Sequence, residues 1–450
     1  MFDCGKSLWG DSAMREVVSI ARARGLQADL FVRRVWEKSI EYEAGVFRGY
    51  VAREHTGCGL RVIRPDKRLG FYAFTPPCAP SEAVEQALEV SAFGDVVDFT
   101  IPSYPSTTEW RDFVDPRLEE LSVREMVEVG EHLVGQLKTT HPEVLTNVRI
   151  VAGREERELF NHHEEEIRFA RTFFDISVEA TRVKDDDILT VYVERSWGNR
   201  DLDVDDLLKE VELKLDLSER VVPIQSGQYP VLFTPSGCMV LLHPLLYGLS
   251  GRNIAFGKSP LQDKFGKVLF SSLFSLVEVP QEPWALGSCP FDDEGILTPE
   301  ERVLVESGKV EDGFWDLWSA ARTGRRTTAS GFRRSPWDMP EPGFSVLKIK
   351  NGLRDRETLV EELEEGLVVD SLLGLGQSNI ASGFFSCGVQ LGFYVKGGEI
   401  QGRVKNVMIS GNAYEALKNI KELSRDCRWV QGSILAPYML VEPIQVNAAS

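Results

Sequence analysis

The stretch from Gln377 to Asn412 constrains the fold more than any other part of the chain. Short runs of aromatic and β-branched residues alternate there with small turn residues, as in Ser382-Gly383-Phe384-Phe385 and Gly397-Gly398-Glu399-Ile400. Such punctuation is typical of successive β-hairpins, because glycine and asparagine accept the backbone conformations that tight turns require. The stretch contains no evident nucleophile, base or metal cluster. We therefore expect it to be scaffold, within a second half of the chain that is rich in short strands.

The length and composition indicate a multidomain folded protein without a membrane helix. The chain has 450 residues, of which 43% are hydrophobic and 27% charged, so two or three domains are expected. No run approaches the roughly 18 apolar residues that a membrane span needs, and residues 1–10 lack the features of a secretory signal. Seven scattered cysteines, none in a Cys-x-x-Cys pair, indicate reduced thiols and a cytoplasmic protein.

The net charge disfavours direct binding to nucleic acid. At −18, the chain would repel a polyanion unless one face were strongly basic. The best basic cluster is Arg322-Thr323-Gly324-Arg325-Arg326, with Arg333 and Arg334 nearby. It is short and lies in a loop rich in small residues, so we interpret it as solvated charge.

The first half of the chain has an order of predicted elements that occurs twice. A helix, several strands and a closing helix are predicted over 12–92, and again from the capping box of Ser122 and Glu125 to a helix over 204–215. The predicted strands of the second copy are 147–151, 158–161, 167–180 and 188–195. A linker is expected over 223–230, followed by a strand over 230–233 and a helix over 238–247.

The fold class is therefore predicted to be α+β. The expected domains are an α+β domain over 1–222, made of two repeats (1–105 and 106–222), and a β-rich domain over 223–450.

Few clusters in the sequence carry obvious chemistry. The adjacent His162 and His163 suit a solvated hairpin tip better than a metal site, because neighbouring strand residues face opposite ways. Asp292-Asp293-Glu294 brings carboxylates together, but we interpret it as a turn before a helix that Thr298-Pro299 would start. Cys289 and Cys387 are expected to be buried structural thiols.

His243 decides whether the sequence contains a zinc peptidase motif. It stands in an apolar segment predicted as a helix, directly before Pro244. A zinc peptidase helix needs two histidines about one turn apart and a glutamate that activates water. This segment has one histidine and no glutamate, so His243 alone is best interpreted as a packed or interface histidine.

Several motifs in order resemble one peptidase family across nearly the whole chain. They include 57–62 and 70–71 in the first half, then 250–251, 264–266, 290–295, 319–322 and 366–369, and the set from Asn379 to Asn412. Together they resemble the TldD/PmbA (TldE) family, whose members have been labelled modulators of DNA gyrase. The resemblance implies a peptidase-type fold.

The family pattern also implies which chemistry this chain lacks. The TldD branch carries His-Glu, three residues and His on the first helix of its C-terminal domain, and a cysteine ligand near the C-terminus. Here the matching positions are His243, Pro244 and Gly248, and the segment around Ser433 has no cysteine. The chain therefore resembles the PmbA/TldE branch, with no metal of its own and zinc expected in a TldD-type partner.

The resulting expectation is a non-metal-binding subunit of a cytoplasmic peptidase complex. It would form a heterodimer with a TldD-type catalytic subunit that acts on unfolded peptides or leader peptides. A homodimer is a further possibility when the chain is alone. The residues expected to line a peptide cavity or an interface are His243, Asp292, Glu294, Asn379, Ser382 and Phe385. The alternatives are an independent hydrolase without zinc, which would use Cys289 or the carboxylates near Asp292, and a regulator of DNA gyrase through protein contact.

Overall fold

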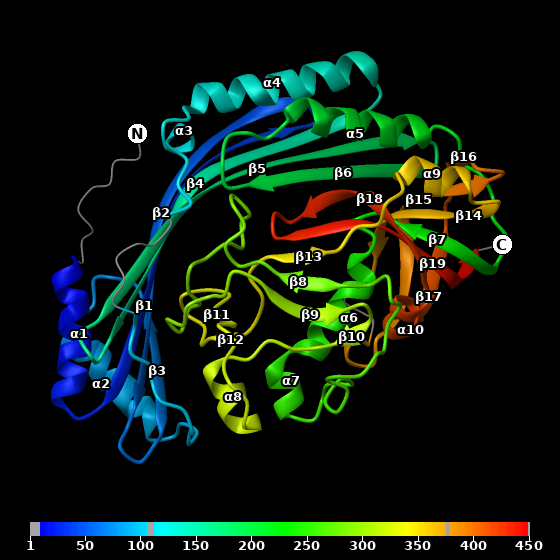
Figure 1. Cartoon of the computed structure of the whole chain (residues 1–450). Coiled ribbons are helices and arrows are strands. Elements are labelled where there is room, and N and C mark those ends of the chain that lie inside the picture. The colour runs from blue at the N-terminus through cyan, green and yellow to red at the C-terminus, as the bar shows by residue number, and fades with distance from the viewer. Residues whose placement is uncertain (1–9, 106–111, 375–378, 449–450) are drawn as a thin grey trace.

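A long antiparallel sheet forms the first half of the molecule. The computed structural model describes residues 10–105, 112–374 and 379–448. Six strands are hydrogen-bonded in the order β3-β2-β1-β4-β5-β6. Their bounds are β1 Gln27–Glu43, β2 Val46–Ile63, β3 Leu69–Phe74, β4 Leu145–Asn161, β5 Glu166–Lys184 and β6 Asp187–Trp197. The sheet curves around the rest of the chain (Figure 1).

Helices cover one face of this sheet. They are α1 Asp11–Ala23, α2 Pro80–Ser91, α3 Pro116–Glu119, α4 Val123–Thr140 and α5 Val204–Leu217. Helix, three strands and helix thus occur twice in the element order, and the central pair β1–β4 joins the two sets. Ser122 accepts from the backbone of Glu125 and Glu125 caps Ser122 in return, so the predicted capping box of α4 is confirmed.

Alternation along β1 assigns its two faces to different partners. Leu30 packs in a core with residues of α1 and α2, and Ile40 packs in another core with residues of α4 and α5. Phe31, which points the opposite way, belongs to a third core that also contains Phe291 of the second half. Because strand residues alternate with a period of two, one face of the sheet carries helices and the other holds the second half of the chain.

The second half is built around a closed ring of strands. β7 (Gly227–Phe233), β14 (Glu365–Leu373), β15 (Phe384–Lys396), β17 (Val407–Asn412) and β19 (Ile434–Ala448) pair in this order. β19 pairs with β7 again, which closes a small barrel. The turn of 397–398 joins β15 to β16 (Glu399–Arg403), so the hairpins predicted for this stretch are confirmed where it is described. Residues 375–378, which include Gln377, lie outside the described residues.

Further strands extend from the barrel, and short helices pack on it. The strands are β8 Leu276–Glu278, β9 Arg302–Glu306, β10 Lys309–Val310, β11 Gly331–Phe332, β12 Glu341–Pro342, β13 Leu347–Ile349 and β18 Ile420–Val430. The helices are α6 Met239–Leu249, α7 Gly251–Ala255, α8 Leu317–Thr323, α9 Arg356–Glu361, α10 Ala413–Lys418 and the 3-10 turn η2 Ile380–Ser382. The chain is therefore a mixed α/β protein with a β-rich C-terminal part. None of the helices in the described ranges is long and apolar enough to cross a membrane.

Three local predictions were wrong. The strands predicted over 147–151 and 158–161 are one strand, β4, because its charged middle is paired with both β1 and β5. No helix follows Thr298, since residues 298–301 lead directly into β9. The expected linker over 223–230 already contains the start of β7. The division at 222–223 remains a prediction, although it falls between α5 and β7.

Candidate functional site

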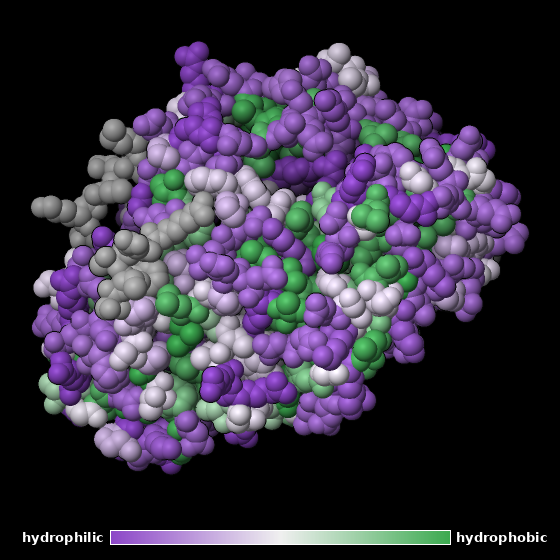
Figure 2. Space-filling model, viewed as in Figure 1, coloured by the Kyte–Doolittle hydropathy of each residue, from purple (hydrophilic) through white to green (hydrophobic). Residues whose placement is uncertain are grey.

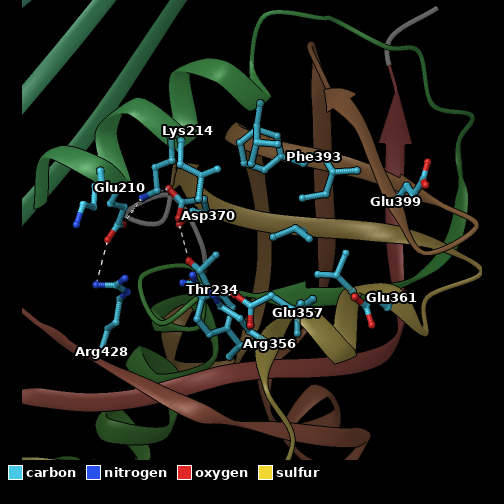
Figure 3. A pocket seen from close by; sticks show the side chains of 18 of the residues that line it. Glu210, Lys214, Thr234, Arg356, Glu357, Glu361, Asp370, Phe393, Glu399 and Arg428 are labelled. Carbon is cyan, nitrogen blue, oxygen red and sulfur yellow. Dashed lines mark hydrogen bonds and ion pairs between the residues drawn. The ribbon is translucent and has the colours of Figure 1, made fainter. Parts of the chain in front are cut away.

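A cavity lies where α5 meets the C-terminal part. It has a volume of about 740 Å³, and its apolar wall includes Leu213, Val360 and Phe393. Figure 3 shows Lys214 and Glu210 on α5 at one end, and Glu361 and Glu399 near the other. The cavity thus joins an apolar wall to charged groups from both halves of the chain.

A buried ion-pair cluster forms the charged end of this cavity. Lys214 Nζ lies 2.8 Å from Glu210 Oε1 and 3.0 Å from Asp370 Oδ2. Glu210 also pairs with Arg195 at 2.5 Å and with Arg428 at 3.4 Å. The cluster links β6 and α5 to β14 and β18, so it fastens the two halves together beside the cavity.

Electrostatics keep this cluster ionised. Burial opposes the ionisation of Glu210, but Lys214 and Arg195 outweigh it and lower its pKa to about 2. Burial also opposes the charge of Lys214, yet Asp370 and Glu210 raise the pKa of its ammonium group. These groups are therefore charged at neutral pH and are placed as fixed structural charges rather than as proton donors or acceptors.

A second cavity, of about 260 Å³, lies on the other side of the cluster and reaches His243. Both cavities are lined by the same six residues, which are Glu210, Lys214, Thr234, Asp370, Arg428 and Tyr438. His243 lines only the second one, together with Gln431 and Trp429. The ion-pair cluster therefore lies between the apolar cavity and the second cavity, which His243 lines.

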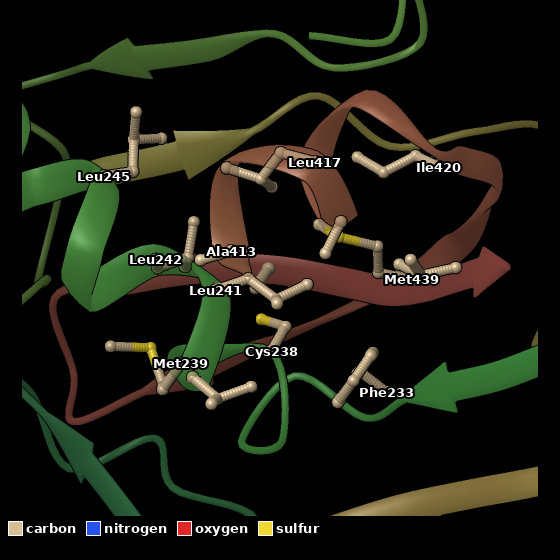
Figure 4. Close-up of a cluster of buried hydrophobic side chains, with 14 of the residues drawn as sticks. Phe233, Cys238, Met239, Leu241, Leu242, Leu245, Ala413, Leu417, Ile420 and Met439 are labelled. Atoms are coloured by element: carbon tan, nitrogen blue, oxygen red, sulfur yellow. The ribbon is translucent and has the colours of Figure 1, made fainter. Parts of the chain in front are cut away.

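His243 lies on the exposed face of helix α6, and the other faces of this helix are buried in the core. His243 is exposed, while its neighbours Leu242, Pro244 and Leu245 are buried. Figure 4 shows α6 against Leu417 and Ala413 of α10 and Met439 of β19, in the core of the barrel. The partial burial of the imidazole lowers the pKa of His243, so the ring is neutral at pH 7.

The position of the expected second helix ligand, five residues after His243, has no room for a side chain. Gly248 is buried, and a Cβ atom there would lie 2.8 Å from the Tyr414 hydroxyl and 3.0 Å from Leu261 Cδ1. The same Tyr414 hydroxyl donates a hydrogen bond to the Pro244 carbonyl at 2.7 Å. Tyr414 thus occupies the space that a second helix ligand would need.

The residues at these positions do not fit a zinc site. Ser433 lines a third cavity, of about 300 Å³, which does not include His243. Throughout 10–105, 112–374 and 379–448, no three histidine, cysteine or carboxylate side chains are grouped to hold a metal ion. An imidazole without a second ligand or a general base cannot provide the chemistry of a zinc peptidase.

The carboxylates of Asp292, Asp293 and Glu294 lie in the interface between the two halves. Glu294 pairs with Arg61 of β2 at 2.7 Å, and Asp293 pairs with Arg157 of β4 at 3.0 Å. Asp292 accepts hydrogen bonds from the backbone of Glu294 and of two further residues, 296 and 331. All three are buried and none lines the three cavities. Burial and the neighbouring Glu294 raise the pKa of Asp292.

The remaining candidates from the hairpin stretch support the backbone. Asn379 accepts from the backbone N–H of Ser382, and the Ser382 carbonyl accepts from Asn412 at 2.8 Å. Phe385 is buried in the barrel core. Cys289 is buried as expected, and burial raises the pKa of its thiol far from the range of a nucleophile.

Sequence reasoning missed the ion-pair cluster around Lys214. One signal was present, because Asp370 directly follows the apolar run 366–369 and so belongs to a buried strand. Its partner on α5 lies more than 150 residues earlier in the chain, and no local pattern connects the two.

Comparisons with known proteins place the chain in a family. Residues 226–448 match the PmbA/TldA metallopeptidase C-terminal domain, and residues 28–91 match the PmbA/TldA metallopeptidase domain 1. An uncharacterised protein of Methanocaldococcus jannaschii is 23% identical over 418 residues, which are 90% of this chain and 93% of that protein.

Named relatives agree with these matches. The metalloprotease PmbA of Escherichia coli O157:H7 is 30% identical over 216 residues, so the match spans 47% of this chain and about half (45%) of that protein. The crystal structure of TldE from Thermococcus kodakarensis has the same fold, with a TM-score of 0.88 and 23% identity, and covers 97% of this chain and 100% of that one. The chain belongs to the PmbA/TldD metallopeptidase family.

Proposed function

We propose that this chain is the non-metal-binding subunit of a TldD/TldE-type peptidase complex, which acts on unfolded peptides or leader peptides. A catalytic partner of the TldD type would hold the zinc ion. In this arrangement, the present chain supplies one wall of the substrate cavity and stabilises the partner.

The packing around Gly248 is the observation that carries the proposal. The family's second helix ligand would stand at this position, and Tyr414 and Leu261 fill the space that its side chain would need. Pro244 stands where the glutamate would be, and Ser433 belongs to the segment that lacks the cysteine. All three family positions therefore differ from the zinc-binding pattern, and the packing around Gly248 is adapted to the absence of a ligand there.

The cavities beside α5 suit a role in holding peptide. An apolar cavity of about 740 Å³ would bind the apolar side chains of a peptide by burying them. The neighbouring ion-pair cluster has its charges satisfied internally, so it would shape the cavity without requiring a charged ligand. His243, neutral and exposed in the adjoining cavity, is a hydrogen-bonding group for a peptide backbone.

Reconstitution of activity tests the proposal. The purified chain is mixed with a TldD-type subunit that carries an intact His-Glu-x-x-x-His motif, and cleavage of an unfolded peptide is measured. We expect strong cleavage only in the mixture. A matched mixture whose TldD-type subunit has glutamine in place of the motif glutamate should be inactive. Equal activity of the partner with and without this chain, or chelator-sensitive cleavage by this chain alone, would contradict the proposal.

A further inference from the structure

A basic and aromatic surface lies around α7 and α8, at the end of the molecule opposite α4 (Figure 1). The two segments 251–268 and 317–326 contain seven lysines and arginines and one aspartate, which gives them a net charge of +6 in a chain of −18. In Figure 2, strongly hydrophilic atoms gather at the lower middle of the molecule, over the place of α8 in Figure 1. We call this surface the α7–α8 patch.

Aromatic rings bring the two segments together. The guanidinium groups of Arg252 and Arg322 lie 5.7 and 5.4 Å from the ring centre of Trp318, which also packs against Phe256 at 5.2 Å. The guanidinium of Arg325 lies 4.5 Å from the ring of Phe265. Stacking of cations on rings fixes the position of the charges and leaves their hydrogen-bond donors free for a ligand.

Most charges of the α7–α8 patch lack an anionic partner. Arg252 pairs with Glu341 at 2.5 Å. The other six cations are exposed, and none of them makes an ion pair with a residue in the described part of the chain; they are Lys258, Lys264, Lys267, Arg322, Arg325 and Arg326. Elsewhere on this molecule, by contrast, exposed arginines such as Arg15, Arg22 and Arg24 pair with glutamates.

We propose that the α7–α8 patch binds a short acidic segment of another polypeptide, rich in aspartate and glutamate. Salt limits the reach of the patch to about 8 Å at physiological ionic strength, so a short acidic segment senses mainly the local positive charge. A long nucleic acid would extend past the patch onto the acidic remainder of the surface, which repels it. The inference concerns a surface distinct from the cavities beside α5, and it does not depend on the proposed zinc-bearing partner.

Fluorescence anisotropy with the full chain tests this inference. The probe is a short labelled peptide in which glutamate alternates with serine; the comparison ligands are its glutamine counterpart and a thymidine oligonucleotide of equal net charge. We expect the glutamate peptide to bind, with an affinity that falls steeply as salt is added, and the glutamine peptide not to bind. The triple variant Arg322→Glu/Arg325→Glu/Arg326→Glu should weaken binding by at least about tenfold.

Two further variants make the result specific. Lys258→Glu/Lys264→Glu/Lys267→Glu reverses the other half of the patch without disturbing the contacts of Arg325, and it should weaken binding similarly. Lys138→Glu/Lys184→Glu/Lys396→Glu makes the same charge change at exposed positions outside the patch and should leave affinity within about twofold. Absence of binding, an equal loss in this last variant, or tighter binding of the oligonucleotide than of the peptide would overturn the inference.

Discussion

At the scale of single residues, the packing around Gly248 leaves no room for a second helix ligand. We predict that Gly248→His destabilises the protein by about 2–3 kcal/mol, since an imidazole overpacks a site closed by Tyr414 and Leu261. Urea unfolding followed by circular dichroism measures this change. His243→Gln, at an exposed position of the same helix, is the matched control and should change stability by less than about 0.5 kcal/mol.

Tyr414 makes this prediction sharper. Removing its hydroxyl in Tyr414→Phe takes away the atom nearest to a new side chain at position 248. Gly248→Ala should therefore cost less stability in the Tyr414→Phe background than in the wild type. Additive effects of the two substitutions would show that Tyr414 does not close the site.

The ion-pair cluster predicts a pH dependence. Glu210 has a pKa of about 2 in the folded protein, below the ordinary glutamate value near 4.3. A depressed pKa stabilises the fold above the unfolded-state value, and this stabilisation is lost as pH falls toward the folded-state value. Glu210→Gln should thus lower the free energy of unfolding by about 3 kcal/mol at pH 7, and the difference from wild type should shrink between about pH 5 and pH 3.

Urea unfolding of both proteins across this pH range provides the measurement. Glu85→Gln, which breaks the exposed pair with Arg24, should change stability by less than about 1 kcal/mol at every pH. A Glu210→Gln effect that stays constant down to pH 3 would contradict the assignment of Glu210 as a buried ionised group.

The sequence predicted the role of a residue where that role depends on residues next to it in the chain. His243 next to Pro244 could be interpreted as an incomplete metal motif because the motif spans only six consecutive residues. The space around Gly248 could not be predicted, because Tyr414 lies on another helix. Asp370, which pairs with Lys214, and Arg61, which pairs with Glu294, lie on strands far away in the sequence and escaped prediction for the same reason.

At the scale of elements, the capping box of α4 gives a direct prediction. Ser122 accepts from the Glu125 N–H at 3.2 Å, and Glu125 accepts from the Ser122 N–H at 2.8 Å. Ser122→Ala should lower the free energy of unfolding by about 1 kcal/mol. Thr139→Ala, at an exposed position in the last turn of α4, should change the free energy of unfolding by less than about 0.5 kcal/mol. An equal loss of stability in both variants would show that the capping box does not stabilise α4.

Helices and hairpins were predictable where local signals agree. Ser122 with Glu125 marked a helix start, and 397–398 marked a hairpin turn. The helix expected after Thr298 fails because β9 takes the chain directly into pairing with β8. The middle of β4 lay outside the two predicted strands, and its charged residues are ordered by ion pairs. Arg157 pairs with Glu155 of the same strand and with Asp293 of the second half.

At the scale of the whole molecule, Arg61 joins the two halves. Its guanidinium pairs with Asp29 of β1 and with Glu294 of the second half, and all three side chains are at most 3% exposed. Arg61→Met should destabilise the protein by about 3 kcal/mol or more, because it leaves two carboxylates buried without a cation. Calorimetry should show a lower melting temperature and weaker coupling between the halves.

The exposed pair of Arg15 and Glu166 is the natural comparison. It joins residues 151 positions apart but is about half exposed. Arg15→Met should therefore change stability by less than about 1 kcal/mol. Similar effects of Arg15→Met and Arg61→Met would mean that burial of the interface pairs does not hold the halves together.

We have proposed that this chain is a metal-free subunit beside a zinc-bearing partner. Native mass spectrometry of the chain alone, and of its mixture with a TldD-type subunit, counts the zinc ions in each species. We predict no zinc on the isolated chain and one zinc per heterodimer, which is lost when the partner's motif histidines are replaced and is kept in His243→Gln. Stoichiometric zinc on the isolated chain, removed by His243→Gln, would contradict it.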